Sequence, residues 1–331
     1  MLKARTPASH VLDRVLVLEM VRVTEAAAIA ASKQVGRGNE RAADQAAVEA
    51  MRAALNELEF DGTIVIGEGE RDEAPMLFIG EKVGCGKGQG PRIDIALDPL
   101  EGTTITAKAG ANAMAVLAIA EEGCLLNAPD VYMEKLAIGP GYPEGTIDLN
   151  RSPTDNILSI AKAKGVDPSE IIACVLDRPR HEQLIADLRA LGCGIMLIPD
   201  GDVSGVIAVT DPETTVDVYM GQGGAPEGVL AAAALRCVGG QFQGRLVFRN
   251  ADERARGDRW GIKDPDRVYT LEELAKGDVI FAATGVTDGS LLDGVKRHTD
   301  RITTESVVMR ASTGTIRWVK GEHRTGAHWF G

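Results

Sequence analysis

Acidic residues follow apolar runs at several points in this chain, where their carboxylates could bind a divalent cation. Asp98 comes directly after an apolar run that is typical of a strand, within Asp98-Pro99-Leu100-Glu101-Gly102-Thr103-Thr104. Glu101 follows three residues later, and two carboxylates this close repel each other unless a cation lies between them. An ordinary acidic turn with a capping threonine explains the same local pattern equally well.

Two more glutamates lie at the ends of predicted elements. Glu68 follows the β-branched run 63–66, and Glu227 lies in the first turn of an Ala-rich helix, after Pro226. A glutamate in a first turn is common, because the helix N-terminus favours negative charge. The recurrence of carboxylates at element ends nevertheless favours one shared site. Oxygen ligands without His or Cys suit Mg²⁺ or Mn²⁺ rather than zinc.

Asp44 lies on the apolar side of a predicted helix. By helical spacing it shares a face with Ala47, Val48, Met51 and Leu55. A buried carboxylate without a partner is costly. Either the nearby helix N-terminus stabilises it, or it faces the same metal site.

Two polar turns after predicted strands could bind a phosphorylated sugar. Arg178-Pro179-Arg180 follows the run 171–176, and two adjacent guanidinium groups can clamp a phosphate, with His181 as a further donor. Asp200-Gly201-Asp202 follows the run 194–199, and its carboxylates suit sugar hydroxyls. A solvated loop and a simple Asp-Gly-Asp turn are the alternatives.

The composition restricts the partners of the chain. Its 331 residues carry a formal net charge of −12, and aromatic residues make up 4%. A negative protein has no overall basic field for a polyanion, and scarce aromatics argue against stacking on nucleic-acid bases. We therefore expect no nucleic-acid partner, and a phosphorylated ligand would need local arginines or bound cations.

The cysteines and the apolar runs predict a cytoplasmic location without a membrane partner. Five scattered cysteines form no C-x-x-C pair, as is typical of reduced thiols in a cytosolic protein. No uncharged apolar run approaches the ~18 residues of a membrane span, and residues 1–15 lack the apolar core of a signal peptide.

Helical and strand patterns alternate along the chain, which predicts α/β layering. We expect helices over 11–34, 40–58 (capped by Asn39), 181–191, 203–209 and 226–237. We expect strands over 63–66, 92–97, 113–120, 171–176, 194–199, 216–220 and 279–284. A soft boundary near 146–153 separates residues 1–150, the metal- and phosphate-binding half, from 151–331, the sugar-binding half, within one continuous sandwich. Residues 321–331 are predicted to be a flexible tail.

Several motifs together resemble a known family. Asp98 to Thr103 is similar to the Asp-Pro-x-Asp/Glu-Gly-Thr signature of the metal-dependent, lithium-sensitive sugar phosphatases. Longer segments between about Val11 and Lys320 resemble class II fructose-1,6-bisphosphatases; they are 36–44, 64–70, 72–77, 129–133, 177–181, 199–202 and 223–228. The resemblance implies the sugar-phosphatase fold, an αβαβα sandwich of two mixed sheets with interleaved helices.

The resemblance also implies an activity and the residues for it. The enzyme would hydrolyse the 1-phosphate of D-fructose 1,6-bisphosphate, in gluconeogenesis or the Calvin cycle, as a homodimer or homotetramer with two or more Mg²⁺ or Mn²⁺ per site. The metal ligands would be Asp44, Glu68, Asp98, Glu101 and Glu227. The catalytic residues would be Thr103, Asp44 and Glu68, with Thr103 orienting a water and Asp44 accepting the proton. The substrate would be bound by Glu101, Gly102, Thr103, Tyr132, Arg178, Pro179, Arg180, Asp200, Gly201, Asp202 and Gly224.

Other functions stay open at this point. The substrate could be sedoheptulose 1,7-bisphosphate, both ketose bisphosphates or an inositol phosphate, and a non-catalytic sensor of sugar phosphates or divalent ions is a remote alternative. A nucleotide-binding P-loop at 84–90 is rejected, because Glu81 replaces its first glycine and Gly88 its Ser/Thr. Glu40 stands where the family commonly has a lysine that helps to neutralise phosphate, and Arg41 could substitute for it.

Overall fold

A computed structural model describes residues 12, 15–69, 75–86, 88, 90–211 and 214–324. The helices are α1 (Leu16–Ser32), α2 (Glu40–Leu55), α3 (Thr103–Ala107), α4 (Pro153–Lys164), α5 (Glu182–Ala190), α6 (Asp202–Ile207), α7 (Ala225–Val238), α8 (Ala251–Arg259) and α9 (Leu271–Leu274). The strands are β1 (Asp61–Ile66), β2 (Lys82–Val83), β3 (Arg92–Glu101), β4 (Met114–Glu121), β5 (Tyr132–Ile138), β6 (Ile172–Leu176), β7 (Gly194–Ile198), β8 (Val218–Gly224), β9 (Gln241–Val247), β10 (Val268–Thr270), β11 (Val279–Gly285), β12 (Lys296–Arg297), β13 (Arg301–Arg310) and β14 (Thr315–Arg324).

The strands of the described residues form two mixed sheets. The first has the order β12-β13-β11-β4-β3-β1-β2, with β14 on the other edge of β13. In it β1 and β3 run parallel, whereas the remaining pairs are antiparallel. The second has the order β10-β9-β5-β8-β6-β7, and β6 runs parallel to both of its neighbours.

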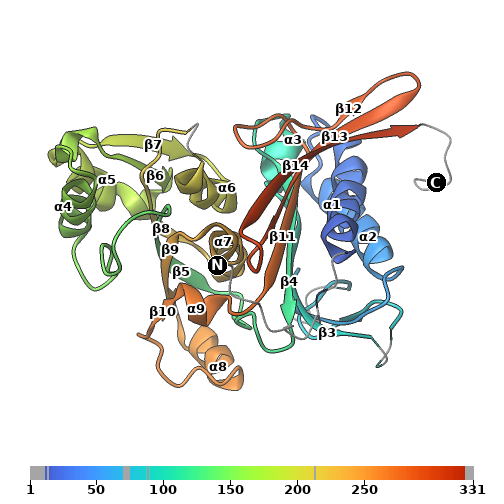
Figure 1. The fold of residues 1–331 in the computed structure, drawn as a ribbon, viewed down its shortest axis with the longest axis horizontal. Helices are drawn as coiled ribbons and strands as arrows, with labels where there is room; N and C mark the ends of the chain where they lie inside the picture. Colours follow the sequence, from blue (N-terminus) through green and yellow to red (C-terminus); the bar gives the residue numbers. More distant parts are fainter. Residues whose placement is uncertain are drawn as a thin grey trace, which may run out of the picture.

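Helices and sheets alternate in five layers (Figure 1). Helices α1 and α2 cover one face of the first sheet, α7 lies between the sheets, and α4 and α5 cover the outer face of the second. The buried apolar side chains form three clusters. One lies between α1, α2 and the first sheet, one surrounds α7 between the two sheets, and one lies between the second sheet and α4 and α5. This arrangement confirms the predicted αβαβα sandwich.

The central helix α7 is buried along its length because its side chains are small. Residues 228–235 are all buried, and four of them are the consecutive alanines 231–234. Small side chains let one helix pack closely against strands of both sheets, including β3 and β11 on one side and β8 and β9 on the other. None of the helices in the described part of the chain is long and apolar enough to cross a membrane.

Most predicted elements are present, with shifted ends. Helix α2 begins after Asn39, whose side-chain Oδ1 accepts a hydrogen bond from the Ala42 N–H at 3.1 Å, as predicted. It ends at Leu55 instead of Leu58, and α1 ends at Ser32; the expected start of that helix at Val11 lies outside the described residues. The sequence patterns missed the helices α4, α8 and α9 and the strands β2, β5, β9, β10, β12, β13 and β14.

Two expectations about element ends are wrong. Strand β3 does not stop at Leu97 but continues to Glu101, so the acidic motif is part of the strand. The predicted flexible tail is a strand as far as Arg324, because β14 pairs with β13 along its whole length. Residues 325–331 lie outside the described part.

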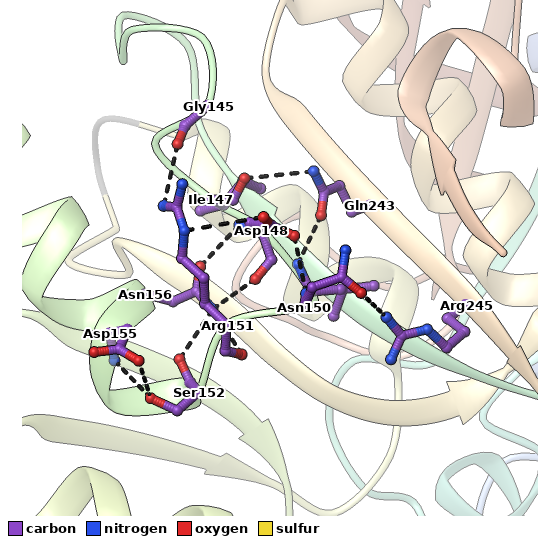
Figure 2. A network of polar contacts seen from close by, with 11 residues as sticks. Gly145, Ile147, Asp148, Asn150, Arg151, Ser152, Asp155, Asn156, Gln243 and Arg245 are labelled. Atoms are coloured by element: carbon purple, nitrogen blue, oxygen red, sulfur yellow. Dashed lines mark hydrogen bonds and ion pairs between the residues drawn. The ribbon is translucent and has the colours of Figure 1, made fainter. Parts of the chain in front are cut away.

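Polar contacts hold the segment around residue 150 against β9 (Figure 2). Asn156 Oδ1 accepts from the Asp148 N–H and its Nδ2 donates to the Asp148 carbonyl, both at 2.9 Å. Gln243 of β9 accepts from the Leu149 N–H at 2.8 Å, and Arg245 donates to Asn150. Both sheets contain strands from either side of this position. The division of the chain at residue 150 into a metal- and phosphate-binding half and a sugar-binding half stays a prediction.

Candidate active site

A cavity of about 320 Å³ opens where β1 and β3 end and α3, α6 and α7 begin. All five predicted metal ligands line it. With them lie other predicted site residues; together the set is Asp44, Glu68, Asp98, Glu101, Gly102, Thr103, Asp200, Asp202 and Glu227. The structure thus brings residues from five separate sequence segments to one place.

An irregularity in β3 lets Asp98 and Glu101 face the same cavity. Side chains of a regular strand alternate between faces, so residues three apart would point to opposite sides. The register of β3 against β4 shifts between Asp98 and Glu101, which changes this alternation. Asp98 Oδ1 then accepts from the Leu100 N–H at 3.0 Å, and Glu101 Oε1 accepts from the Val203 N–H at 2.8 Å.

Gly102 connects this strand to α3. Its φ of 93° is in the left-handed region, which glycine adopts without steric cost. The sharp turn places Thr103 at the first position of α3, half-buried and on the cavity wall. Thr103 is therefore held in place by a helix start and not by a mobile loop.

Asp44 and Glu68 reach the cavity from two other elements. Asp44 lies on the second turn of α2 and is half-buried. Glu68 follows β1 and its N–H donates to the Leu77 carbonyl at 3.1 Å. Gly67 between β1 and Glu68 must be glycine, because a Cβ there would collide with that same carbonyl oxygen.

Glu227 lies in the first turn of α7 and folds back over Gly224. A Cβ on Gly224 would collide with Glu227 Oε2, so the glycine makes room for this carboxylate. Gly224 was expected to contact the sugar and does not line the cavity. Its observed contact is with a predicted metal ligand.

Burial raises the pKa of all five predicted metal ligands, and repulsion from neighbouring carboxylates adds to the rise for four of them. The pKa of Glu68 rises to about 8, mainly through burial and then through Asp44. Burial also raises the pKa of Asp98 and Glu101 well above the usual range, reinforced most by Glu68 and Asp202 respectively. Burial raises the pKa of Asp44, and burial followed by Asp202 raises that of Glu227. The cluster therefore needs positive charge to be fully ionised near neutral pH.

The donor set fits divalent cations. Glu101 Oε2 and Glu227 Oε2 are buried, and neither has a hydrogen-bond partner among the described residues. Buried carboxylate oxygens without partners are costly, and Mg²⁺ and Mn²⁺ bind such oxygens. Within the described ranges, no three His, Cys, Asp or Glu side chains already stand close enough to hold one ion.

Lys135 supplies a buried positive charge behind the cluster. This residue of β5 is fully buried and forms an ion pair with Asp202, which is 6% exposed. Gly223 leaves room for the pair, since a Cβ there would collide with Asp202 Oδ2 and approach Lys135 Nζ. The Asp202 carboxylate, predicted to bind the sugar, is thus held by a lysine that sequence reasoning did not single out.

The remaining predicted substrate residues lie outside the cavity lining. Arg178 approaches it, with Nη2 at 3.8 Å from Asp200 Oδ1. Arg180 donates from Nε and Nη2 to the Gln222 carbonyl at 3.1 and 2.7 Å, and its guanidinium lies over the Tyr132 ring at 4.8 Å from the centroid. Pro179 is exposed in a short 3₁₀ turn between these arginines. Gly201 has a φ of 84° and begins α6.

His181 does not provide a phosphate donor, contrary to the expectation. Its ring is 3% exposed, with Nδ1 at 2.7 Å from the Leu176 carbonyl and Nε2 accepting from the Gln222 N–H at 2.8 Å. These partners require the tautomer with the proton on Nδ1. Burial lowers the pKa of His181, with Arg180 and Arg178 adding to the effect, so a neutral ring joins β6 to β8.

Two further residues adjoin the site without having been predicted. Asp130 lines the cavity, and Arg249 lies over Tyr132 at 4.4 Å from the ring centroid. Asp130 falls within the quoted family motif 129–133, which is the signal that could have found it. Arg249 carries no local signal, because its position depends on β9 pairing with β5.

Two residue patterns discussed above lie away from the cavity. Glu40 is exposed at the first position of α2, and neither it nor Arg41 is a lining residue. In the glycine-rich segment, Gly84, Gly86 and Gly90 pack against Phe60, where a Cβ would collide with its backbone. These glycines serve packing.

Comparisons with known proteins identify the family. A family model described as "Bacterial fructose-1,6-bisphosphatase, glpX-encoded" matches residues 14–323. Fructose-1,6-bisphosphatase 1 class 2 of Escherichia coli K12 is 48% identical over 324 residues, which covers 94% of this chain and 95% of that protein. Fructose-1,6-bisphosphatase class 2 of Shigella flexneri shows the same identity and coverage. The cavity, its carboxylates and these matches together show that the chain belongs to the bacterial class II fructose-1,6-bisphosphatases.

Proposed function

We propose that this protein hydrolyses the 1-phosphate of D-fructose 1,6-bisphosphate to fructose 6-phosphate and inorganic phosphate. The observation that carries the proposal is the convergence of five carboxylates and Thr103 on one cavity, in a chain of this family. Carboxylates alone would repel a phosphate, so the site makes chemical sense as a cation-dependent phosphatase.

The carboxylates would hold two or more divalent cations. Bound Mg²⁺ or Mn²⁺ supplies positive charge to the phosphate oxygens and lowers the pKa of water. Support comes from the raised pKa of Glu68, Asp98 and Glu101. It also comes from the buried Oε2 atoms of Glu101 and Glu227, which have no hydrogen-bond partner among the residues that the structure describes. We propose that the ions are Mg²⁺ or Mn²⁺.

The protein's own groups would position the reactants. Thr103 at the start of α3 orients the attacking water, and Asp44 accepts the proton that passes through the threonine hydroxyl. Water attacks phosphorus while the bond from phosphorus to the sugar O1 breaks; the electron pair of that bond stays on O1, which takes up a proton from solvent. Gly102 and Thr103 hold the phosphate at the turn, Asp200 and Asp202 bind sugar hydroxyls, and Tyr132, Arg178 and Arg180 hold the retained phosphate.

Replacement of Thr103 by alanine tests this assignment. We expect kcat to fall by about 10²–10⁴-fold, the range for a positioned proton-transfer group, with little change in KM. Thr104→Ala is the matched control, because Thr104 is also half-buried in α3 but does not line the cavity. A loss of less than tenfold for Thr103→Ala would rule out the role.

Substrate and metal are tested by one comparison. The kcat/KM values for fructose 1,6-bisphosphate, sedoheptulose 1,7-bisphosphate and inositol monophosphate are measured with Mg²⁺ and with Mn²⁺. The proposal requires the fructose ester to be hydrolysed efficiently, and absence of turnover on all three would favour a sensor. A cytoplasmic homodimer or homotetramer completes the proposal, with sedimentation of the purified protein as its test.

A further inference from the structure

Two guanidinium groups lie over the ring of Tyr132. The Cζ atoms of Arg180 and Arg249 are 4.8 and 4.4 Å from the ring centroid. A guanidinium over an aromatic ring is attracted to its π-electrons, and stacking fixes the plane of the cation. Arg180 belongs to the residues expected to bind substrate, whereas Arg249 has no role in the proposed mechanism.

The second sheet places Arg249 at this position. Tyr132 is the first residue of β5, and it pairs with Val247 of β9 on one side and with Gly224 of β8 on the other. Arg249 follows Val247 by two residues, so the turn after β9 carries it to the end of β5. It therefore lies at the same sheet edge as Tyr132 and the start of α7.

Glu253 holds the Arg249 side chain in a defined orientation. Glu253 Oε1 accepts from Arg249 Nε and Nη2 at 2.8 and 2.5 Å, and Oε2 accepts from the Arg249 backbone N–H at 2.6 Å. Glu253 is 2% exposed, whereas the arginine side chain is 51% exposed. The glutamate uses the Nε–Nη2 edge of the fork, so the outer edge with Nη1 faces no partner among the described residues and can bind another anion.

The charge around Arg249 suits a phosphate. Arg180 and Arg249 lie over Tyr132, and Arg178, two residues before Arg180, pairs with Asp200, in a chain whose net charge is −12. The hydrogen bonds that Arg249 donates to Glu253 raise the pKa of Arg249, and the nearby Asp130 carboxylate adds to this rise. Asp130, which lines the cavity, lies two residues before Tyr132, so the guanidinium over the Tyr132 ring lies near the cavity edge. A sugar bisphosphate brings a second phosphate that the carboxylate cluster repels, and arginines at the edge can neutralise it.

We propose that Arg249 is a substrate-binding residue which, together with Arg178 and Arg180, holds the phosphate that stays on the sugar. Glu253 and Tyr132 orient it for this contact. The inference rests on the proposed function, because it presupposes a substrate with two phosphates. It adds to the site a residue that comes from the β9–α8 turn.

Arg249→Ala tests the inference through a split between KM and kcat. We expect KM for fructose 1,6-bisphosphate and the Kd of fructose 6-phosphate to rise about 10- to 100-fold, as for a lost charged hydrogen bond. We expect kcat to change less than about threefold, because the residue lies away from the reacting phosphate. Arg249→Lys, which keeps the charge but loses the planar fork, should show an intermediate KM.

The chain offers a matched control in Arg267. This arginine also lies over a tyrosine, at 4.9 Å from the Tyr269 centroid, and pairs with a glutamate, Glu273. Its side chain is 48% exposed, yet it lies at β10 and not at the cavity. Arg267→Ala should leave KM and kcat unchanged.

A double variant separates binding from folding. Arg249→Ala leaves the buried Glu253 without its partner, whereas Arg249→Ala/Glu253→Ala removes that carboxylate as well. The raised KM should persist in the double variant. A wild-type KM in either variant, or a loss confined to kcat and melting temperature, would overturn the inference. Wild-type protein that releases no phosphate from fructose 1,6-bisphosphate would instead overturn the proposed function, and Kd values for fructose 6-phosphate would still test Arg249.

Discussion

Lys135 and Asp202 are the only buried ion pair behind the carboxylate cluster among the residues that the structure describes. Burial and then Asp202 raise the pKa of Glu227, whereas Lys135 lowers it. One lysine therefore neutralises Asp202 and offsets part of the repulsion on a predicted metal ligand. Its ammonium group has no contact with solvent, so its effect is little screened.

Replacement of Lys135 by methionine leaves Asp202 buried and unpaired. We expect the free energy of unfolding to fall by about 3–5 kcal/mol, the usual cost of breaking a buried pair. Divalent-cation affinity should change as well, because Glu227 loses a neighbouring positive charge. Urea denaturation and calorimetric Mn²⁺ titration measure the two effects.

The double variant Lys135→Met/Asp202→Asn is the control for that experiment. It removes both charges, so most of the stability should return, since a pair replaced as a unit often costs little. If the single variant is as stable as wild type, Lys135 does not hold the Asp202 carboxylate.

The sequence allowed prediction of the residues whose position follows from a nearby strand or helix end. Asp98, Glu68 and Glu227 were found in this way, and the structure brings them to one cavity. Lys135 and Arg249 were not found, because each acts across strands that are far apart in sequence. Lys135 looks like any lysine of a polar strand until β5 is known to lie at the centre of the second sheet.

At the scale of elements, the junction between β8 and α7 controls the position of Glu227. Gly224 has ordinary extended dihedral angles, with φ of −67° and ψ of 145°, which alanine adopts without strain. Its missing side chain is what allows Glu227 to fold back. The glycine therefore acts on the carboxylate and not on the backbone.

Gly224→Ala should impair cation binding while it preserves the fold. The new Cβ pushes the Glu227 carboxylate away, so we expect the metal concentration for half-maximal activity to rise about 10- to 100-fold, as for a disturbed ligand shell. The melting temperature should change by less than about 3 °C. Glu227→Gln is the comparison and should show a similar or larger rise; an unchanged metal requirement for Gly224→Ala would contradict this explanation.

Among the elements, those with strong local patterns were predicted and those without were missed. The Ala-rich helix α7 and the capped helix α2 carry their own start signals, Pro226 and Asn39. The long strands β13 and β14 lack a regular alternation of apolar and polar residues. In β13 the polar run 303–306 is followed by the apolar run 307–309, and β14 is exposed along much of its length. Only the pairing of these two strands with each other and with β11 makes them strands. The register shift between Asp98 and Glu101 in β3 was not predicted either, because it is defined by the pairing of β3 with β4.

For the whole molecule, the raised pKa values predict how stability depends on pH without metal. Glu68 titrates at about 8 in the folded chain against an ordinary value of 4.5. Between these values the unfolded chain holds fewer protons than the folded one, so stability falls as pH rises. We expect the melting temperature of metal-free protein to drop from pH 5 to pH 8 by on the order of 5 °C.

Added Mg²⁺ or Mn²⁺ should reverse this trend. Cations bind the ionised carboxylates, so the gain in melting temperature should be larger at pH 8 than at pH 6, and binding should release protons. Differential scanning calorimetry measures the melting temperature of the metal-free protein in EDTA and of the cation-bound protein, each at both pH values. Equal gains at the two pH values would show that the cations bind somewhere other than the carboxylate cluster.

The position of α7 between the two sheets has a consequence for the life of the protein in a cell. A helix buried along most of its length cannot unfold locally, so the backbone of its first turn, which carries Glu227, opens only when the sheets separate. Loss of cations therefore weakens the whole sandwich and not one loop. Proteases that degrade unfolded chains act on that same global opening, so the amount of enzyme in the cell would follow the supply of divalent cations.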